Sequence, residues 1–214
     1  RFQDHSKARS DRFSRRYHRL IRERFERQLA LLHTDVVGST QGFQDHGDVT
    51  GRGLQQRHLA IVTRVLENFG GTLFNSTGDG AWCFFESAED AVRGAILSQR
   101  LVAADNRESG SNVRLNIRAG VHVGPTLQDG TELAGHSVNL CARIADLADS
   151  RQVSLSRETF SELGSELRGH CGQFAAKFVK RVTEPVEFTF VEWRNAKDPV
   201  RVLIEEMGRD FELD

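Results

Sequence analysis

Hydrophobic and polar positions alternate with two different periods along the chain. A mostly apolar segment over residues 29–37 that ends at Gly38 is typical of a buried strand. Apolar residues then recur three and four positions apart over residues 54–69, which predicts an amphipathic helix that ends at Gly70. The same change from strand period to helix period recurs further on, so the pattern indicates a sheet with helices packed against it.

The later elements follow from the same two periods. In order, the predicted elements are strands at 72–74 and 81–85, a helix at 88–104, a strand at 113–123, a hairpin that turns at Gly124-Pro125 and at 128–130, a helix at 138–147 that Ser137 opens, a strand at 152–155, a short helix at 158–163 and a last hairpin of strands at 174–182 and 186–193. The order strand, helix, strand, strand, helix, strand predicts an α+β fold of the ferredoxin-like, split βαβ sandwich kind, with an additional helix and a C-terminal hairpin.

The chain is long enough for one well-buried domain with flanking elements. We divide its 214 residues into a basic N-terminal helix (1–28), a main domain (29–194) and a C-terminal helical tail (195–214). Residues 1–28 hold nine Arg and one Lys against four acids, whereas the whole chain has a net charge of −1. The apolar residues of this basic segment recur at helical spacing, at Phe13, Tyr17, Leu20, Ile21 and Phe25. We therefore expect an amphipathic helix docked on the body or on a second subunit, with nucleic acid binding only a minor alternative.

Cysteine use and hydropathy predict a cytoplasmic protein. Cys83, Cys141 and Cys171 are widely spaced and form no CxxC pair, so we expect buried thiols in a reducing compartment rather than a disulfide frame or a zinc site. No apolar run approaches the ~20 residues of a membrane span, and no signal-peptide pattern opens the sequence. We also expect no appended sensor or membrane domain.

Two short turns carry the most informative chemistry. Asp35 lies in Thr-Asp-Val-Val-Gly-Ser-Thr, and Asp79 lies in Ser-Thr-Gly-Asp-Gly, each where an apolar strand meets a turn of small residues. Two such carboxylates suit a pair of Mg²⁺ or Mn²⁺ ions, which bind phosphate oxygens. Gly38, Ser39 and Thr40 open a helix whose backbone N–H groups favour an anion. The alternative is that one aspartate caps a helix and the other fills a hairpin turn.

A third motif is Gly-His-Ser-Val-Asn-Leu-Cys-Ala-Arg over residues 135–143. Its Asn139 and Arg143 are four positions apart on a predicted helix and therefore share one face. This pair would suit phosphoryl transfer, in which the amide orients a ribose and the guanidinium stabilises the negative charge that develops at the phosphorus. The alternative is a surface Asn beside a salt-bridged Arg.

In this order the motifs resemble those of the class III nucleotide cyclase catalytic domain, from Gln28 to Trp193. The matching segments are TDVVGST, STGDG, IRAGVHVGP, GHSVNLCAR and FVKRVTEPVEF. The resemblance implies that Asp35 and Asp79 bind two divalent metal ions, Mg²⁺ or Mn²⁺, with the Val36 carbonyl as a further ligand. The reaction implied is conversion of a nucleoside triphosphate to its 3′,5′-cyclic monophosphate, with release of pyrophosphate.

The resemblance also implies how the site is assembled. Asn139 and Arg143 would stabilise the transition state as the ribose 3′-hydroxyl attacks the α-phosphorus. In this family the metal-binding carboxylates of one subunit face the Asn and Arg of the other, so a homodimer is implied. Lys180 and Arg181 stand where the family holds the triphosphate, and His122 is interpreted as structural.

Two positions depart from the family pattern and concern the base. Asn75 stands four residues before Asp79, where adenylate cyclases usually carry Lys, and Glu132 stands where they commonly carry Asp or Thr. Guanylate cyclases typically have Glu and then Cys at these positions. The hydrogen-bonding groups of Asn75 and Glu132 could serve any of the four bases.

We favour a pyrimidine, UTP or CTP, because altered base readers in a chain without an appended domain resemble the pyrimidine cyclases of bacterial anti-phage (Pycsar) signalling. Those enzymes make cyclic UMP or cyclic CMP, which a separate effector protein reads. The alternatives are a guanylate or adenylate cyclase with unusual base readers, and a degenerate fold that only binds a nucleotide or a partner. The presence of all four of Asp35, Asp79, Asn139 and Arg143 argues against degeneration.

Overall fold

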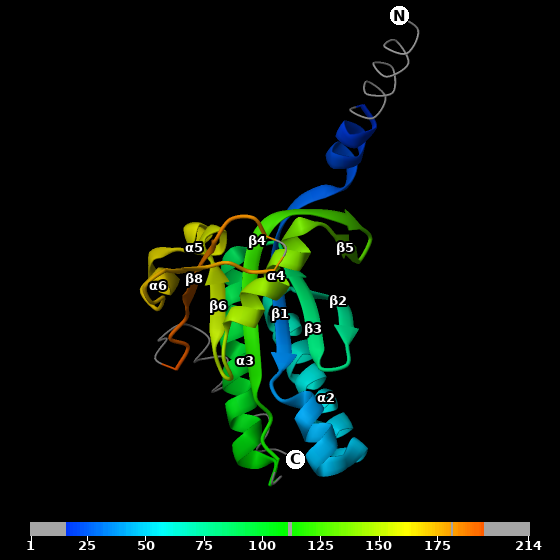
Figure 1. Ribbon diagram of the computed structural model, residues 1–214, viewed down its shortest axis with the longest axis vertical. Helices are drawn as coiled ribbons and strands as arrows, with labels where there is room; N and C mark the ends of the chain where they lie inside the picture. The colour runs from blue at the N-terminus through cyan, green and yellow to red at the C-terminus, as the bar shows by residue number, and fades with distance from the viewer. Residues whose placement is uncertain (1–15, 111–112, 181, 195–214) are drawn as a thin grey trace, which may run out of the picture.

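One mixed β-sheet forms the centre of the protein (Figure 1). The computed structural model describes residues 16–110, 113–180 and 182–194, with the backbone alone for residues 40–46. The strands are β1 (Glu26–Val36), β2 (Thr72–Thr77), β3 (Gly80–Phe85), β4 (Ile117–Asp129), β5 (Glu132–Ala134), β6 (Val153–Ser156), β7 (Ala175–Lys177) and β8 (Val186–Phe190). They lie in the order β2-β3-β1-β4-β6-β8-β7, and β5 pairs with β4.

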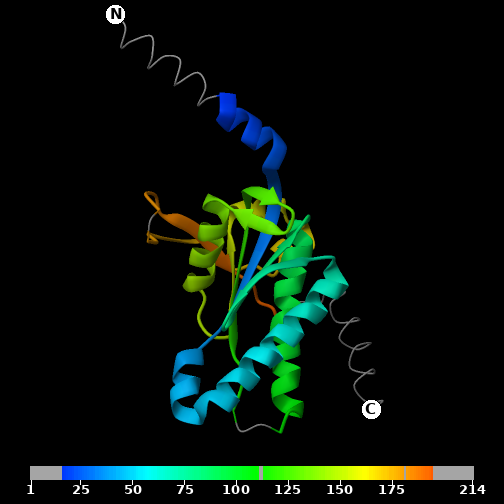
Figure 2. The same ribbon diagram turned by 90° about the vertical axis from the view of Figure 1, so that its right-hand side faces the viewer.

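Helices cover both faces of the sheet (Figure 2). They are α2 (Ser39–Phe69), α3 (Ala88–Glu108), α4 (His136–Leu147), α5 (Arg157–Glu162) and α6 (Ser165–Arg168). Helices α2 and α3 lie on one face, where Leu32, Val65 and Ile96 are among the buried residues of the main core. Helix α4 lies on the other face, where Cys141 packs with Leu31 in a smaller apolar cluster. Alternate residues of β1 therefore belong to different cores.

The strand order confirms the predicted fold class. The segment from β1 to β4 places its strands in the order β4-β1-β3-β2 with every neighbouring pair antiparallel, which is the ferredoxin-like arrangement. The predicted additional helix is α4. The predicted C-terminal hairpin is the antiparallel pair of β7 and β8.

The central strand β4 differs from its prediction. It begins at Ile117 rather than at residue 113, and it runs without a turn through Gly124 and Pro125, so the predicted turn there is wrong. The glycine instead allows close packing, because a Cβ at Gly124 would lie 2.6 Å from the Ser137 hydroxyl oxygen. The chain first reverses in the turn between Asp129, the last residue of β4, and Glu132, the first residue of β5. Long pairing with β1 therefore overrides the turn preference of Gly-Pro.

The basic N-terminal segment projects from the body of the protein. Its described residues 16–25 are helical and extend beyond the sheet (Figure 1), and β1 already begins at Glu26, three residues before the predicted boundary. Tyr17 and Leu20 remain 55% and 51% exposed. The end of the helix nevertheless lies against the body, because Ile21 and Phe25 line a hollow together with Leu127 of β4 and Leu133 of β5. Docking on a second subunit stays a prediction. Residues 1–15 and the predicted tail (195–214) lie outside the described residues.

Two of the three cysteines are buried, as the sequence analysis expects. Cys83 and Cys141 are buried free thiols and Cys171 is half-buried. Burial raises the pKa of Cys83 and Cys141 to about 12, so these two thiols are unreactive at neutral pH. None of the described helices combines the length and the apolar character that crossing a membrane requires.

Candidate active site

Asp35 and Asp79 meet at one end of the central strands. Asp35 pairs in register with Gly80, the residue that follows Asp79, and the backbone N–H of Val36 donates to the Asp79 carbonyl at 3.1 Å. Both aspartates line a cavity of about 560 Å³, together with Val36, Gly38 and Ser39. Strand pairing thus brings together two turns that are 44 positions apart in the sequence.

The turn between β1 and α2 places the beginning of a helix beside this cavity. Gly38 has a φ of 74°, a left-handed conformation that glycine adopts without steric cost, and α2 starts at the next residue. The Ser39 hydroxyl donates a hydrogen bond to the Asp79 carboxylate. The cavity therefore combines carboxylate oxygens with the unpaired N–H groups of a helix N-terminus, which suits a metal-bound phosphate.

Arg118 is a cavity residue that the sequence analysis did not assign. It lies directly opposite Asp35 in the pairing of β1 with β4. Its Nε and Nη2 donate to Asp35 Oδ2 at 3.0 and 2.8 Å, and Nη2 also forms an ion pair with Asp146 Oδ1 at 3.1 Å. The sequence offers one signal, because strand alternation places Arg118 on the face opposite Ile117 and Ala119.

Two neutral histidines flank the end of β1. His33 stacks on Trp82 with the ring centroids 3.9 Å apart, and its buried Nδ1 has no hydrogen-bond partner in the described part of the chain. His58, from α2, hydrogen-bonds the Thr34 hydroxyl at 2.9 Å. Burial lowers the pKa of each histidine to about 4. At neutral pH these imidazoles therefore add no positive charge beside Asp35 and Asp79.

Asn139 and Arg143 lie on α4, outside the carboxylate cavity of their own chain. Asn139 is exposed, and its Nδ2 donates only to the Gly135 carbonyl at 3.2 Å among the residues described. Arg143 Nη1 forms an ion pair with Asp146 Oδ2 at 3.0 Å. Neither side chain lines the cavity that holds Asp35 and Asp79, although Asp146, the partner of Arg143, also pairs with Arg118.

The remaining predicted site residues are also distributed elsewhere. Asn75 is exposed on β2, and Lys180 is exposed between β7 and β8. Glu132 lines a separate hollow of about 240 Å³ beside Phe25. Arg181 and the side chain of Thr40 lie outside the described residues.

Solved structures with a similar fold include nucleotide cyclases. The guanylyl cyclase Cya2 superimposes with a TM-score of 0.70 over 78% of this chain and 92% of its own, at 20% sequence identity. The adenylyl cyclase CyaB from P. aeruginosa gives a TM-score of 0.64 over 78% of this chain and 94% of its own, at 21% identity. The fold is that of the class III nucleotide cyclase catalytic domain.

Sequence comparison finds relatives of the same kind. A Rhizobium meliloti (strain 1021) protein provisionally named adenylate cyclase 3 is 32% identical over 138 residues, which are 64% of this chain and 24% of that protein. An adenylate cyclase of Mycosarcoma maydis is 26% identical over 64% of this chain and 6% of its own length. The chain thus spans about a quarter or less of these two relatives. No protein-family model matches it.

The donor atoms around the cyclase-fold cavity fit a divalent cation with a phosphate ligand. Within the described residues, no three His, Cys, Asp or Glu side chains gather closely enough to hold a metal ion by themselves. Mg²⁺ is commonly bound by one or two carboxylates together with substrate phosphates and water. Asp35 and Asp79, with the Val36 carbonyl nearby, match that smaller requirement.

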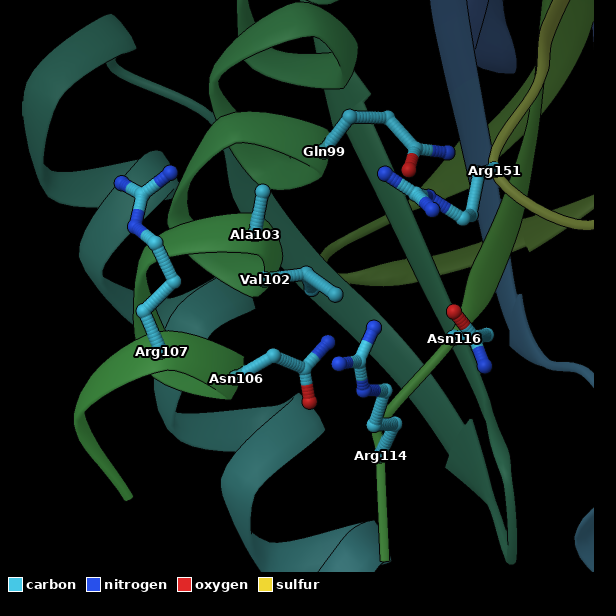
Figure 3. A pocket seen from close by; sticks show the side chains of 8 residues that line it. All are labelled: Gln99, Val102, Ala103, Asn106, Arg107, Arg114, Asn116 and Arg151. Atoms are coloured by element: carbon cyan, nitrogen blue, oxygen red, sulfur yellow. The ribbon is translucent and has the colours of Figure 1, made fainter. Parts of the chain in front are cut away.

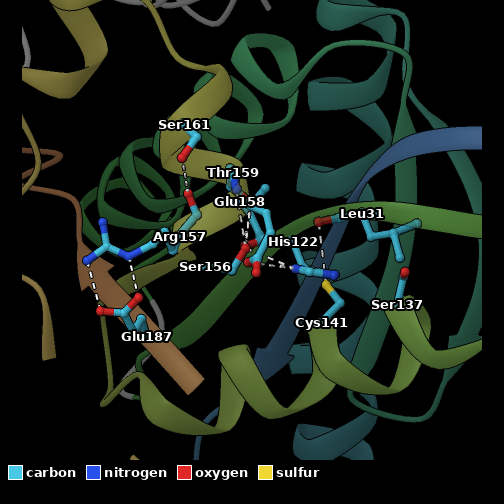
Figure 4. A network of polar contacts seen from close by, with 12 residues as sticks. Leu31, His122, Ser137, Cys141, Ser156, Arg157, Glu158, Thr159, Ser161 and Glu187 are labelled. Atoms are coloured by element: carbon cyan, nitrogen blue, oxygen red, sulfur yellow. Dashed lines mark hydrogen bonds and ion pairs between the residues drawn. The ribbon is translucent and has the colours of Figure 1, made fainter. Parts of the chain in front are cut away.

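His122 occupies a structural position in the cyclase fold, as the sequence analysis proposed. It is 4% exposed, and its Nδ1 lies 2.9 Å from the Ser156 hydroxyl, within the network of Figure 4. Ser156 also contacts Thr159, whose hydroxyl donates to the Val121 carbonyl. Burial lowers the pKa of His122 to about 4. The neutral ring therefore ties β4 to β6 and α5.

Proposed function

We propose that the chain is the catalytic domain of a metal-dependent nucleotide cyclase, with residues 29–194 forming the domain. The observation that supports this most is the convergence of Asp35, Asp79 and the beginning of α2 on one cavity within a cyclase fold. The reaction is conversion of a nucleoside triphosphate to its 3′,5′-cyclic monophosphate and pyrophosphate. A merely nucleotide-binding module would not need both carboxylates and the Asn139–Arg143 pair.

The chain's own groups divide the work of this reaction. Asp35, Asp79 and the Val36 carbonyl would hold Mg²⁺ or Mn²⁺, which when bound lowers the pKa of the attacking hydroxyl and neutralises phosphate charge. Arg118 supplies a planar guanidinium suited to phosphate oxygens. The N–H groups at Gly38, Ser39 and Thr40 support the same triphosphate, and Lys180 and Arg181 add basic charge to it.

The active site is shared between the two chains of a homodimer. Asn139 and Arg143 lie outside the carboxylate cavity of their own chain and on a different helix. A partner chain can bring its own α4 to this cavity, so that its Asn139 orients the ribose and its Arg143 meets the charge that develops on phosphorus. Transition-state stabilisation would then depend on dimerisation.

The base is proposed to be a pyrimidine, read by Asn75 and Glu132. This preference rests on the departure of both residues from the adenylate and guanylate patterns. The product would then be cyclic UMP or cyclic CMP, made in the cytoplasm and read by a separate effector in anti-phage defence. A purine cyclase is the second candidate, because the curated relatives are named as adenylate cyclases.

The direct test is product formation from each nucleotide. Purified protein is incubated with Mn²⁺ and with ATP, GTP, CTP or UTP in turn, and the products are identified by mass spectrometry. A cyclic pyrimidine nucleotide supports the full proposal, and turnover of ATP or GTP alone refutes the base preference. No cyclic product from any of the four would refute the cyclase itself.

A double substitution separates base recognition from catalysis. Asn75→Lys with Glu132→Asp installs residues typical of adenylate cyclases and should raise kcat/KM for ATP by about tenfold or more relative to UTP. The control Asn68→Lys adds the same charge on the exposed side of α2 and should leave the preference unchanged. An unchanged preference in the double variant would show that other residues read the base.

A further inference from the structure

A second cavity, of about 190 Å³, lies between α3 and the segment that leads into β4 (Figure 3). Polar and basic side chains dominate its lining, including Arg114, Arg151, Asn106 and Asn116, and no carboxylate belongs to the lining. The cavity adjoins the carboxylate site without being part of it: the Asn116 carbonyl accepts a hydrogen bond from the backbone N–H of Val37 at 2.9 Å. The two cavities share no lining residue.

Two guanidinium groups point into this cavity. Figure 3 shows Arg114 and Arg151 directed into it from different segments, whereas the side chain of Arg107 turns away across α3. No ion pair or side-chain hydrogen bond joins Arg114 or Arg151 to another residue in the described part of the chain. The nearby carboxylate of Asp105 is engaged by Arg57. Both arginines are solvent-exposed, and among the described residues no carboxylate pairs with either guanidinium.

The backbone that carries Arg114 is fixed in place. Asn106 Nδ2 donates to the Leu115 carbonyl at 2.6 Å, and the Leu115 N–H donates to Asn106 Oδ1 at 2.8 Å. This reciprocal pair ties the residue next to Arg114 to α3. The guanidinium is thus presented from an ordered segment, which reduces the entropy lost when it binds a ligand.

The backbone that carries Arg151 is held from the other side. Gln99, only 1% exposed, donates from Nε2 to the carbonyls of Ile117 and Gln152, each at 3.1 Å. Arg151 itself has a φ of 65°, the one left-handed conformation of a residue other than glycine in the described chain. That conformation is strained for a residue with a side chain, so the surrounding hydrogen bonds must fix the backbone that carries this arginine.

We propose that this cavity is a binding site for a small phosphate-type dianion. Arginine offers planar, paired donors that match phosphate oxygens, and two such groups here face a space lined by amides. The volume of about 190 Å³ is below the roughly 300 Å³ at which pockets for organic ligands begin. It therefore suits an ion of the size of inorganic phosphate rather than a nucleotide. The inference does not depend on the cyclase activity.

Nuclear magnetic resonance can test the site directly. The full chain, labelled with ¹⁵N-arginine, is titrated with inorganic phosphate in EDTA, with chloride at matched ionic strength as reference. The Nε–Hε signals of Arg114 and Arg151 should shift saturably. Arg114→Gln and Arg151→Asn should each raise the dissociation constant about tenfold or more, because each removes a charge-assisted contact.

Matched variants separate a loss of phosphate contacts from a loss of the fold. Asn readily adopts the left-handed conformation of residue 151, so Arg151→Asn should keep the fold, checked by circular dichroism and thermal unfolding. Arg107→Gln removes the guanidinium that points away and should bind phosphate like the wild type. The proposal is overturned if neither Arg114 nor Arg151 shifts saturably, if both variants keep the wild-type affinity, or if only the Arg118 signal responds.

Discussion

The charge of the carboxylate cavity depends on a few individual residues. Asp35, Asp79 and Asp149 line it, and Arg118 is the only basic residue among its described lining residues. The resulting net charge of −2 favours a cation. Arg118 already donates to one oxygen of Asp35, so a metal ion would compete with this guanidinium for the carboxylate. A bound triphosphate would relieve the competition by pairing with the guanidinium itself. We therefore expect metal and nucleotide to bind with positive coupling.

Replacing Asp79 tests the metal assignment. Asp79→Ala should abolish calorimetric binding of Mn²⁺ in the presence of a non-hydrolysable triphosphate and lower kcat about a hundredfold or more, because bound metal supplies several kcal/mol of charge stabilisation. Thermal stability should change little, since Asp79 is in a half-buried turn and its carboxylate accepts a hydrogen bond only from Ser39 among the described residues. The control Asp48→Ala removes an exposed carboxylate of α2 and should bind Mn²⁺ normally. Normal Mn²⁺ binding by Asp79→Ala would contradict the assignment.

Buried histidines should make the protein less stable in mild acid. The pKa of His58 and that of His122 fall from 6.5 to about 4 in the folded protein, because burial disfavours the charged ring. The free energy of unfolding is therefore unaffected by these groups above pH 6.5 and declines as the pH falls from 6.5 toward 4, because only the unfolded chain takes up protons in that interval. The free energy of unfolding should drop by about 2 kcal/mol per histidine between pH 7.5 and 5.

Urea unfolding at pH 7.5 and at pH 5 measures this effect. His122→Gln should shrink the difference between the two pH values, whereas the control His136→Gln, at an exposed position, should preserve it. Equal stability of the wild type at both pH values would show that these rings are not buried in the neutral form.

The sequence predicted some of the site residues and missed others for physical reasons. Asp35 and Asp79 were predictable because each follows a strand and stands in a turn of small residues. Arg118 was missed because its importance comes from pairing across strands, and one strand's pattern does not say which residue lies opposite. His33 and His58 were missed because their burial depends on contacts with residues that are distant in sequence, Trp82 for His33 and Thr34 for His58.

At the scale of elements, the contact between α4 and β4 positions the helix that carries Asn139 and Arg143. A Cβ at Gly120 would lie 2.3 Å from the backbone nitrogen of Ala145, so only glycine allows this approach. The Ser154 hydroxyl further ties the two elements, donating to the carbonyls of Ile144 and Ala119. Both elements are therefore held at a fixed distance.

Adding one methyl group at Gly120 should displace α4. Gly120→Ala should lower the free energy of unfolding by about 1–3 kcal/mol or more through overpacking, and it should reduce cyclase activity further than stability alone explains. The control Gly53→Ala adds a methyl in α2 where no atom lies within 4 Å, and it should stabilise by roughly 0.5–1 kcal/mol. Urea unfolding and initial rates measure both. Wild-type stability of Gly120→Ala would contradict the close contact.

Element prediction succeeded where local signals and tertiary structure agree. Helix α2 ends at Phe69 with Gly70 as its left-handed cap, as the sequence predicts. It failed at Gly124 and Pro125, where pairing with β1 continues the strand through a turn-like dipeptide. For residues 16–25 the apolar stripe correctly predicted a helix, but it did not say which surface the helix covers.

At the scale of the whole molecule, one chain has only half of the proposed active site. Neither Asn139 nor Arg143 lines the carboxylate cavity of the described structure. The exposed Tyr17 and Leu20 of the projecting helix offer further apolar surface for a partner. Sequence alone could not separate a site within one chain from one shared by two, because the motifs are the same in both cases.

The central claim is that a cyclase site forms from Asp35 and Asp79 of one chain with Asn139 and Arg143 of another. Asp35→Ala and Arg143→Ala proteins are assayed separately and after equimolar mixing, with subunit exchange verified by native mass spectrometry. Each variant alone should make no cyclic nucleotide, and the mixture should recover about one quarter of wild-type activity, since half of the dimers are mixed and each carries one intact site. An exchanged mixture that stays inactive would contradict the claim.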